Sequence, residues 1–415
     1  MKRASLAISM MIGLLSLSAC HEESQLQQEI NDQIPSQSSH LRSAVTQADW
    51  TPGSISSIVP LDQLEDLGGQ PTEKEVWKSN NPEIFRGTGW LMQNSRTDAT
   101  RGGAPTPLSG TFPIYLFHIN QSGSQKYVHI LVTNPNNSAI TVSGKGSMYT
   151  NSEKPLLGAG TGQSFHVAKD WLNNTPRYSF SNVNINKYKA YEIARLPVAN
   201  NSMIDGRFEV TASAGAYVYT VVTSTGSLTD AINKSQSGPA NGDIYSPNPN
   251  AYGREAGVYE SSEWVGSTDI SLPSSQSYIG FALNTSGKFA YNGVYQQDQN
   301  APAVTRLSDS ADKTYGNYGH RYDITLAMNN PNSTAKQVTL YFASNYTNSV
   351  NSPSFTYNGP LRMNGVVKNI YTTPTAPRQW LATWNIPAGA NFNGKLDFYI
   401  PGLITTGQQL ILQVN

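Results

Sequence analysis

The chain has 415 residues, of which only 13% are charged, and its 28 basic residues balance its 28 acidic residues. Soluble globular proteins carry about 25% charged residues, so neutral polar side chains replace charge over much of this surface. A chain with no net charge and no basic patch lacks the counterion release that drives nucleic-acid binding, and we expect no nucleic-acid partner. Two interpretations fit this surface: contact with uncharged polymers such as glycans, or an exported β-protein with long polar loops.

The N-terminus has the pattern of a bacterial lipoprotein signal. Two basic residues precede an apolar run over residues 6–17, which ends in the motif Leu17-Ser18-Ala19-Cys20. Small residues before the cleavage point are typical of a secretory signal, and the cysteine that follows them is where a lipoprotein receives its lipid. We predict that residues 1–19 are removed and that Cys20 is lipidated. The alternative is an ordinary cleaved signal peptide with an incidental cysteine.

The predicted anchor also predicts the location of the protein. The apolar run is shorter than the roughly 20 residues that a membrane-spanning helix needs, so we expect attachment to the membrane through the lipid on Cys20. His21 follows this cysteine, and the absence of Asp at that position favours the outer membrane over the inner membrane. Cys20 is the single cysteine of the chain, so no thiol remains for a disulfide.

Residues 20–49 are rich in Gln, Ser, Glu and Asn and nearly lack aromatic side chains. Such a segment buries too little apolar surface to offset the entropy of ordering, which predicts a flexible tether. Beyond it, runs of β-branched and aromatic residues bounded by Gly, Pro, Asn and Ser are typical of strands. The clearest runs are residues 127–132, 216–222, 338–342, 396–400 and 410–412. We expect only short helices, at residues 61–67 and 228–234.

Two turn segments indicate an internal repeat. Asn134-Pro135-Asn136-Asn137-Ser138 and Asn329-Asn330-Pro331-Asn332-Ser333 each lie between predicted strands. Farther along, Tyr346 follows Tyr149 by 197 residues, while Pro331 follows Pro135 by 196. The predicted fold class is therefore all-β, with two related β-sandwich or jelly-roll-like domains. The expected limits are residues 50–225 for the first domain, 226–252 for a linker and 253–415 for the second domain.

The chain contains several distinctive short motifs: Thr51-Pro52-Gly53, Asn80-Asn81-Pro82-Glu83, His118-Ile119-Asn120, Asp205-Gly206-Arg207, residues 253–259 and residues 315–319. Together they resemble signature stretches of an exported bacterial family, of cyanobacterial type, that is known as a domain of unknown function. The resemblance covers about residues 51–415. It implies no catalytic residues, because the family has no established activity.

The sequence contains no pattern that indicates a catalytic centre, a metal site or a cofactor, and we expect none. His118 and His129 flank a predicted turn, but a tetrahedral metal site needs three or four ligands. Asp309 and Asp312 lack the glycine and the closing glutamate of a calcium loop. The glycine-rich stretch at residues 158–162 lacks the lysine of a phosphate loop.

The carboxylates of Glu260 and Glu263 support an alternative hypothesis. They lie near Tyr259 and Trp264, and glycoside hydrolysis needs two carboxylates that flank one bond. On a strand, residues three apart face opposite sides, whereas on a short helix they share a face. The alternative is therefore a glycan-active enzyme, of the glycoside hydrolase or lyase type, that uses such a pair.

Aromatic side chains are the main signal for ligand binding. We predict a possible ligand-binding set formed by Tyr315, Tyr318, His320, Arg321, Trp380 and Trp384. The two tryptophans are four apart, which on a continuous strand places them on one face. Exposed rings would stack on sugars, and buried rings would belong to the core. The leading hypothesis is a lipid-anchored envelope protein that binds or scaffolds a polysaccharide or an envelope protein without catalysis.

Overall fold

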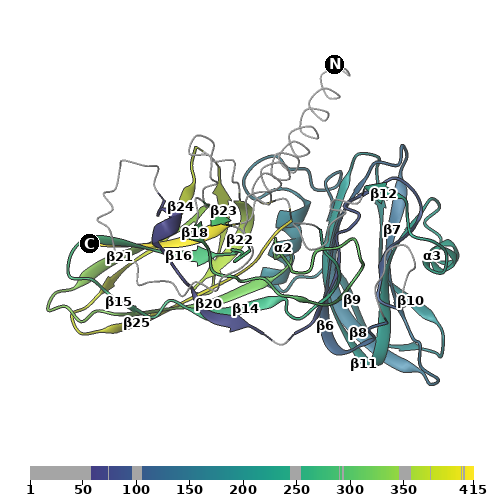
Figure 1. The fold of residues 1–415 in the computed structure, drawn as a ribbon, viewed down its shortest axis with the longest axis horizontal. Coiled ribbons are helices and arrows are strands. Elements are labelled where there is room, and N and C mark those ends of the chain that lie inside the picture. Colours follow the sequence, from purple (N-terminus) through teal and green to yellow (C-terminus); the bar gives the residue numbers. More distant parts are fainter. Residues whose placement is uncertain are drawn as a thin grey trace, which may run out of the picture.

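The computed structural model describes residues 58–95, 105–243, 254–344 and 357–415, except for 73, 289, 292–293, 374, 403 and 405–406. The predicted signal, Cys20 and the tether lie outside these residues. Strands make up most of the described chain, so the expected all-β fold is confirmed. No helix in this part is both long enough and apolar enough to cross a bilayer. Two units lie side by side, with helix α2 (Gln163–Asn173) between them (Figure 1).

The first unit is built on one branched sheet that encloses a large apolar core. Its strands are β3 (Val76–Ser79), β4 (Ile84–Phe85), β5 (Gly89–Gln93), β6 (Leu108–Asn120), β7 (Lys126–Thr133), β8 (Ile140–Thr150), β9 (Tyr178–Ile185), β10 (Ala190–Val198), β11 (Met203–Thr223), β12 (Gly242–Asp243), β13 (Ala256–Tyr259) and β19 (Ala303–Arg306). Helix α3 (Leu228–Ser235) packs on β11 and β5.

Strand β11 makes this core possible because it belongs to both layers around it. Its first half pairs with β6 and β8, and its second half pairs with β5 and β7. The pairing with β6 is irregular between Ala212 and Ala216, within a run of Ala, Ser and Gly. Small side chains permit the bend that carries one strand from one layer to the other.

The second unit has a five-stranded and a seven-stranded sheet on either side of a second core. The five-stranded sheet consists of β1 (Leu64–Glu65), β16 (Ser277–Leu283), β26 (Gln408–Val414), β21 (Lys336–Ser344) and β24 (Arg378–Ile386). The seven-stranded sheet consists of β2 (Gly68–Pro71), β14 (Glu263–Ser267), β15 (Ile270–Ser271), β20 (Arg321–Asn329), β25 (Asn391–Tyr399), β22 (Tyr357–Met363) and β23 (Val366–Thr372). A small hairpin joins β17 (Ala290–Tyr291) to β18 (Val294–Tyr295).

The two units share a strand order. The order β9-β8-β11-β6-β3 in the first unit corresponds to β24-β21-β26-β16-β1 in the second, and the last strand is parallel to its neighbour in both. In the other layers, β10 pairs with β7 as β25 pairs with β20. The finer expectation of two related sandwiches stays a prediction, and this matched order favours it.

The repeated asparagine turns occupy matching places in this order. In each turn, the residue before the proline is an asparagine, Asn134 or Asn330. Its side-chain amide donates to the carbonyl four residues later and to the carbonyl of Ile185 or Ile386, at the end of a neighbouring strand. The amide oxygen accepts the N–H two residues later. Asn120 makes the same set of bonds after β6. One side chain thus ties the turn to a third segment.

The chain also crosses between the units. Strands β1 and β2, from the N-terminal end of the described chain, pair with β16 and β14 of the second unit. Conversely, β13 and β19 extend the sheet of the first unit through β3.

Of the two helices expected from the sequence, the one at 228–234 is present as α3, whereas the one at 61–67 is wrong. Leu61–Gln63 form one turn of 3-10 helix, and β1 follows. Pairing with β16 outweighs the short helical pattern.

We expect the substitution Asn330→Ala to lower the free energy of unfolding by on the order of 3 kcal/mol. The fully buried amide donates to the carbonyls of Thr334, Ile386 and Pro387 at 2.9, 2.9 and 3.0 Å. Leaving the buried Ile386 carbonyl unpaired costs about 1–3 kcal/mol, and the two partly buried bonds add to this. Denaturant unfolding measures the change. The exposed neighbour Ser333 provides the control Ser333→Ala, and an equal effect of both substitutions would contradict this role.

Candidate functional site

The outer face of the five-stranded sheet carries a group of aromatic side chains, which we call the aromatic face: Tyr278, Tyr341 and Trp380. Tyr341 on β21 is paired with Trp380 on β24 in one row of the sheet. The adjacent row contains Tyr278, Gln413, Thr339 and Thr383 on four neighbouring strands. Residues on the opposite side of the same strands point into the second core. Residues 58–64 cover the part of the outer face near Tyr278 and Tyr341.

A bulge in β24 separates the two tryptophans predicted to share a face. The register of β24 against β21 shifts at Leu381, so Trp380 faces outward and Trp384 lies on the core side. An extra residue in one strand reverses the alternation beyond it. Trp380 is 52% exposed. Trp384 packs against Phe392, with their ring centroids 4.8 Å apart.

Polar and charged groups surround the exposed tryptophan. Its indole N–H donates to the Thr383 hydroxyl at 3.0 Å, and the Lys368 ammonium lies 4.0 Å from the ring centroid. The guanidinium of Arg378 lies 4.5 Å from the ring centroid of Tyr341. The aromatic face therefore combines flat rings, hydroxyl and amide groups, and two cations.

The other predicted ligand-binding residues are mostly buried. Tyr315, Tyr318 and His320 are at most 9% exposed. The Tyr315 hydroxyl donates to Asp312 at 2.5 Å, and that of Tyr318 donates to the carbonyl of Ile404 at 3.2 Å. They therefore lie within the packed structure and do not join Trp380 on one surface.

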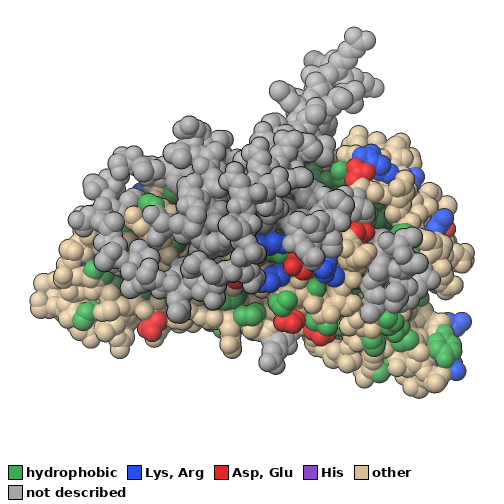
Figure 2. Space-filling model, in the orientation of Figure 1, with side chains coloured by type: hydrophobic (Ala, Val, Ile, Leu, Met, Phe, Trp, Pro, Cys, Tyr) green, Lys and Arg blue, Asp and Glu red, His purple; other side chains and the backbone are tan. Residues whose placement is uncertain are grey.

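Arg321 belongs to an ion-pair network on the outer side of the seven-stranded sheet. Its guanidinium binds Glu263 at 2.6 Å, Asp323 at 2.9 Å and Asp397 at 3.5 Å. Arg362 binds the same Asp397 at 2.5 Å and donates to a carbonyl of α2. On the face seen in Figure 2, basic and acidic side chains lie next to one another near the middle of the view and also toward its right side. The network couples neighbouring strands and the helix.

A second group of residues forms what we call the polar junction, where the two units meet: Lys78, Tyr115, Asp205, Arg207 and His320. All are at most 5% exposed. Lys78 and Arg207 are paired with Tyr115 on either side in the sheet. The sequence marks Asp205 and Arg207 only through the motif that contains both, and it gives no sign that Lys78 is buried.

Arg207 spans the junction. Its guanidinium lies 4.3 Å from the ring centroid of Trp171 on α2 and 4.6 Å from that of Tyr399 on β25. Its Nε donates to the carbonyl of Gly319 at 2.9 Å. Cation–ring contacts of this kind gain strength when water is excluded. One side chain of the first unit thus contacts the helix and two segments of the second unit.

Asp205 lies where a segment of the second unit approaches the sheet of the first. A Cβ on Gly402 would lie 2.3 Å from its carboxylate, 2.9 Å from the Ser164 hydroxyl and 3.0 Å from the Tyr115 hydroxyl. Only glycine permits this approach without displacing one of these groups. The three oxygens therefore converge on a single backbone position of the second unit.

Burial shifts the pKa values of three side chains of the polar junction. It raises the pKa of Asp205 to about 7, against the opposing effect of the nearby Ser164 hydroxyl and Gly402 amide. Burial lowers the pKa of Lys78 to about 8, with nearby Glu255 opposing the change. It also lowers the pKa of His320 well below its ordinary value, helped by Lys78 and Arg207. The junction therefore disfavours charge, in accord with the cost of desolvation.

The two histidines considered as metal ligands both have structural partners. His118 contacts Ser79 and the carbonyl of Pro82, each at 2.8 Å. His129 contacts Glu192 at 2.5 Å and Thr223 at 2.8 Å. Within the described ranges, no group of three or more His, Cys, Asp or Glu is arranged to hold a metal ion.

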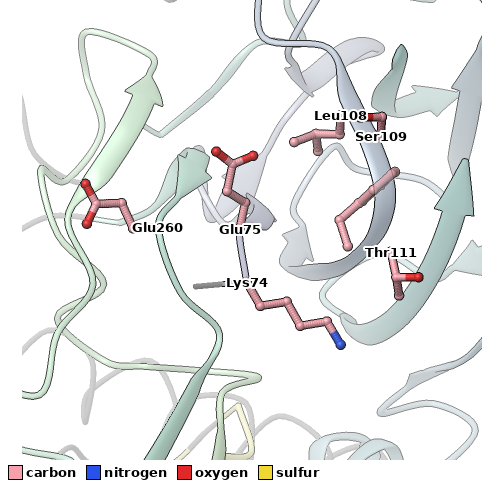
Figure 3. A pocket seen from close by; sticks show the side chains of 7 residues that line it. Lys74, Glu75, Leu108, Ser109, Thr111 and Glu260 are labelled. Atoms are coloured by element: carbon pink, nitrogen blue, oxygen red, sulfur yellow. The ribbon is translucent and has the colours of Figure 1, made fainter. Parts of the chain in front are cut away.

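The carboxylates predicted as an enzymatic pair have different surroundings. Glu263 binds Arg321, whereas Glu260 lines an open cleft of about 450 Å³ (Figure 3). Because Val76 pairs with Tyr259, Glu75 and Glu260 occupy the next two opposed positions, and both are exposed. The other lining residues are Lys74, Leu108, Ser109, Thr111 and Phe112. Both carboxylates are open to solvent, in contrast to the apolar pocket that surrounds a glycosidase general acid.

Comparison with known proteins agrees with the resemblance seen in the sequence. Residues 207–364 match the family described as "Protein of unknown function (DUF3370)", so the resemblance to a family of unknown function is confirmed over this range. No curated protein matches the chain.

Similarities to solved structures are slight. An anti-sigma factor domain-containing protein from Clostridium clariflavum is 8% identical, with a TM-score of 0.15, over 70% of this chain and 79% of that one. The CBM22-1-CBM22-2 tandem domain of Paenibacillus barcinonensis Xyn10C is 5% identical, with a TM-score of 0.15, over 79% of this chain and 98% of that one. Scores this low establish neither a shared fold nor a function.

We expect the substitution Asp205→Asn to stabilise the protein at pH 8. The folded-state pKa of about 7 lies above the ordinary value of 3.8, so the folded state binds more protons between these values and its stability falls as pH rises through this window. The free energy of unfolding that is lost through this carboxyl is about 4 kcal/mol, and the loss is complete above pH 7. Thermal unfolding from pH 4 to 8 should show a flatter profile for the variant.

The control for this experiment is Asp243→Asn. Asp243 binds Arg86 on the surface, and hydrogen bonding to that guanidinium lowers the pKa of the carboxyl. This substitution therefore should not remove the fall in stability between pH 4 and 7. An unchanged profile for Asp205→Asn would show that the carboxyl is not protonated in the folded state.

Proposed function

We propose that this protein is a non-catalytic binding protein of the bacterial cell envelope, that a lipid on Cys20 holds it to a membrane, and that it binds a polysaccharide on the aromatic face. The supporting observation is Trp380, a large ring that is 52% exposed on the outer side of the five-stranded sheet and lies beside Tyr341. Aromatic rings offer flat apolar surface at low conformational cost.

The dimensions of the aromatic face suit an extended polymer. Tyr278 and Trp380 lie on strands β16 and β24, which are separated by β26 and β21. Strands lie about 4.8 Å apart, so the face extends over roughly 15 Å. Hydroxyl and amide groups of Thr383 and Gln413 lie in the adjacent row of the sheet. They would supply hydrogen bonds to sugar hydroxyls between the rings.

The anchor that we propose rests on the motif at Cys20. Attachment to the outer membrane would keep the protein among envelope polymers. A binding function requires no catalytic group at its centre, and the aromatic face can contribute to it through stacking, hydrogen bonds and charge.

Trp380→Ala should weaken retention by an envelope polysaccharide about tenfold, because it removes the most exposed ring of the face. Affinity electrophoresis of the full-length protein, in gels that contain the polysaccharide, measures retention. Tyr188, which is 63% exposed in the first unit, provides the matched control Tyr188→Ala. Equal retention of the wild type and the Trp380 variant would refute binding at this face.

Cys20→Ser should release the protein from the membrane fraction or leave it unprocessed, because the serine oxygen cannot form the thioether of a lipoprotein. Membrane fractionation and the mass of the N-terminal peptide report the two effects. Normal processing and normal membrane retention of the variant would disprove the lipid anchor while leaving polysaccharide binding open.

A further inference from the structure

The charge around the aromatic face differs from that of the whole chain. Strands β16, β26, β21 and β24 contain no Asp or Glu. Glu65, at the end of β1, is the single carboxylate of the five-stranded sheet. By contrast, Lys368 and Arg378 both lie against rings of the face. Positive charge therefore dominates around the aromatic face, although the whole chain has no net charge.

These two cations differ from others in the second unit. Arg321, Arg362 and Lys395 bind carboxylates of the same sheet at 2.5–2.9 Å. Within the described part of the chain, neither Lys368 nor Arg378 has a carboxylate partner. The Lys368 ammonium donates to the carbonyl of Leu381, a neutral acceptor. Both cations are therefore available to an anionic ligand.

We propose that the polymer bound at the aromatic face is an acidic polysaccharide, in which carboxylate or sulfate groups on the sugars pair with Lys368 and Arg378. This inference rests on the proposed function and adds the chemical class of the ligand. Sugar rings stack on Trp380 and Tyr341. The planar guanidinium of Arg378 offers two parallel donors, which match the two oxygens of a carboxylate.

Charge and stacking make separable contributions to such binding. Ion pairs at an exposed surface weaken as ionic strength rises, whereas stacking on Trp380 does not depend on the charge of the polymer. The wild type should therefore bind an acidic polymer more tightly than a neutral one at low salt, and the difference should shrink at high salt.

The test is affinity electrophoresis of the full-length protein in gels that contain alginate, dextran sulfate or neutral dextran, at low and at high salt. The double variant Lys368→Gln/Arg378→Gln should bind at least one acidic polymer about tenfold more weakly than the wild type at low salt, a larger loss than that for neutral dextran. Alginate and dextran sulfate distinguish carboxylate from sulfate recognition. Trp380→Ala should weaken binding to every polymer that retards the wild-type protein.

Two controls separate charge from folding. Lys187 lies 4.7 Å from the ring centroid of the exposed Tyr188, so Lys187→Gln removes an equivalent cation–ring contact at a distant site and should leave binding unchanged. Lys368→Arg keeps the charge and should retain binding to the acidic polymer. Thermal unfolding of each variant verifies that the fold is intact.

The outcomes distinguish this inference from the proposed function. Equal binding of acidic and neutral polymers, with no effect of the double variant, overturns the acidic ligand and leaves polysaccharide binding standing. Binding to no polymer overturns both. Retention by vesicles of phosphatidylglycerol, without binding to alginate or dextran sulfate, assigns the cations to a lipid surface and also overturns the inference.

Discussion

Arg207 connects the two units through a charge that lies almost entirely out of water. Its side chain is 5% exposed, and its guanidinium contacts Trp171, Tyr399 and the carbonyl of Gly319. A buried cation without partners would cost several kcal/mol, so the helix, β25 and the loop before β20 must stay where these contacts form. The relative placement of the two units therefore depends on this junction.

The junction also determines which surface of the second unit remains open. Tyr399 and the Arg321 network lie on the outer side of the seven-stranded sheet, toward α2 and the first unit. The second core lies behind that sheet, and the five-stranded sheet forms the far layer. Its outer side faces away from the second core and from the Arg321 network. Residues 58–64 cover one part of it and Trp380 is exposed on another.

Exchanged strands reinforce this arrangement. Because β1 and β2 pair within the second unit while β13 and β19 pair within the first, the units cannot separate without breaking main-chain hydrogen bonds. A face presented by such a body keeps a constant shape, which would reduce the entropy lost on binding the polymer that we propose as its ligand. The uneven distribution of charge would add selectivity to the binding that we propose, since Lys368 and Arg378 near Trp380 have no carboxylate partner in the described chain whereas Arg321 and Arg362 do.

The sequence by itself determined the local features. Alternating β-branched and aromatic residues predicted strands, because the period of two is a property of each strand alone. The asparagine turns could also be predicted, since most of their hydrogen bonds close within five residues.

Tertiary structure decided which side of each strand is covered. Tyr318 and Trp380 were both predicted as ligand-binding rings, yet Tyr318 is buried and donates to the carbonyl of Ile404, whereas Trp380 is 52% exposed. A single bulge at Leu381 separates Trp380 from Trp384. Burial, exchanged pairing and the pKa of Asp205 all arise from segments far apart in the chain, so no local pattern could reveal them.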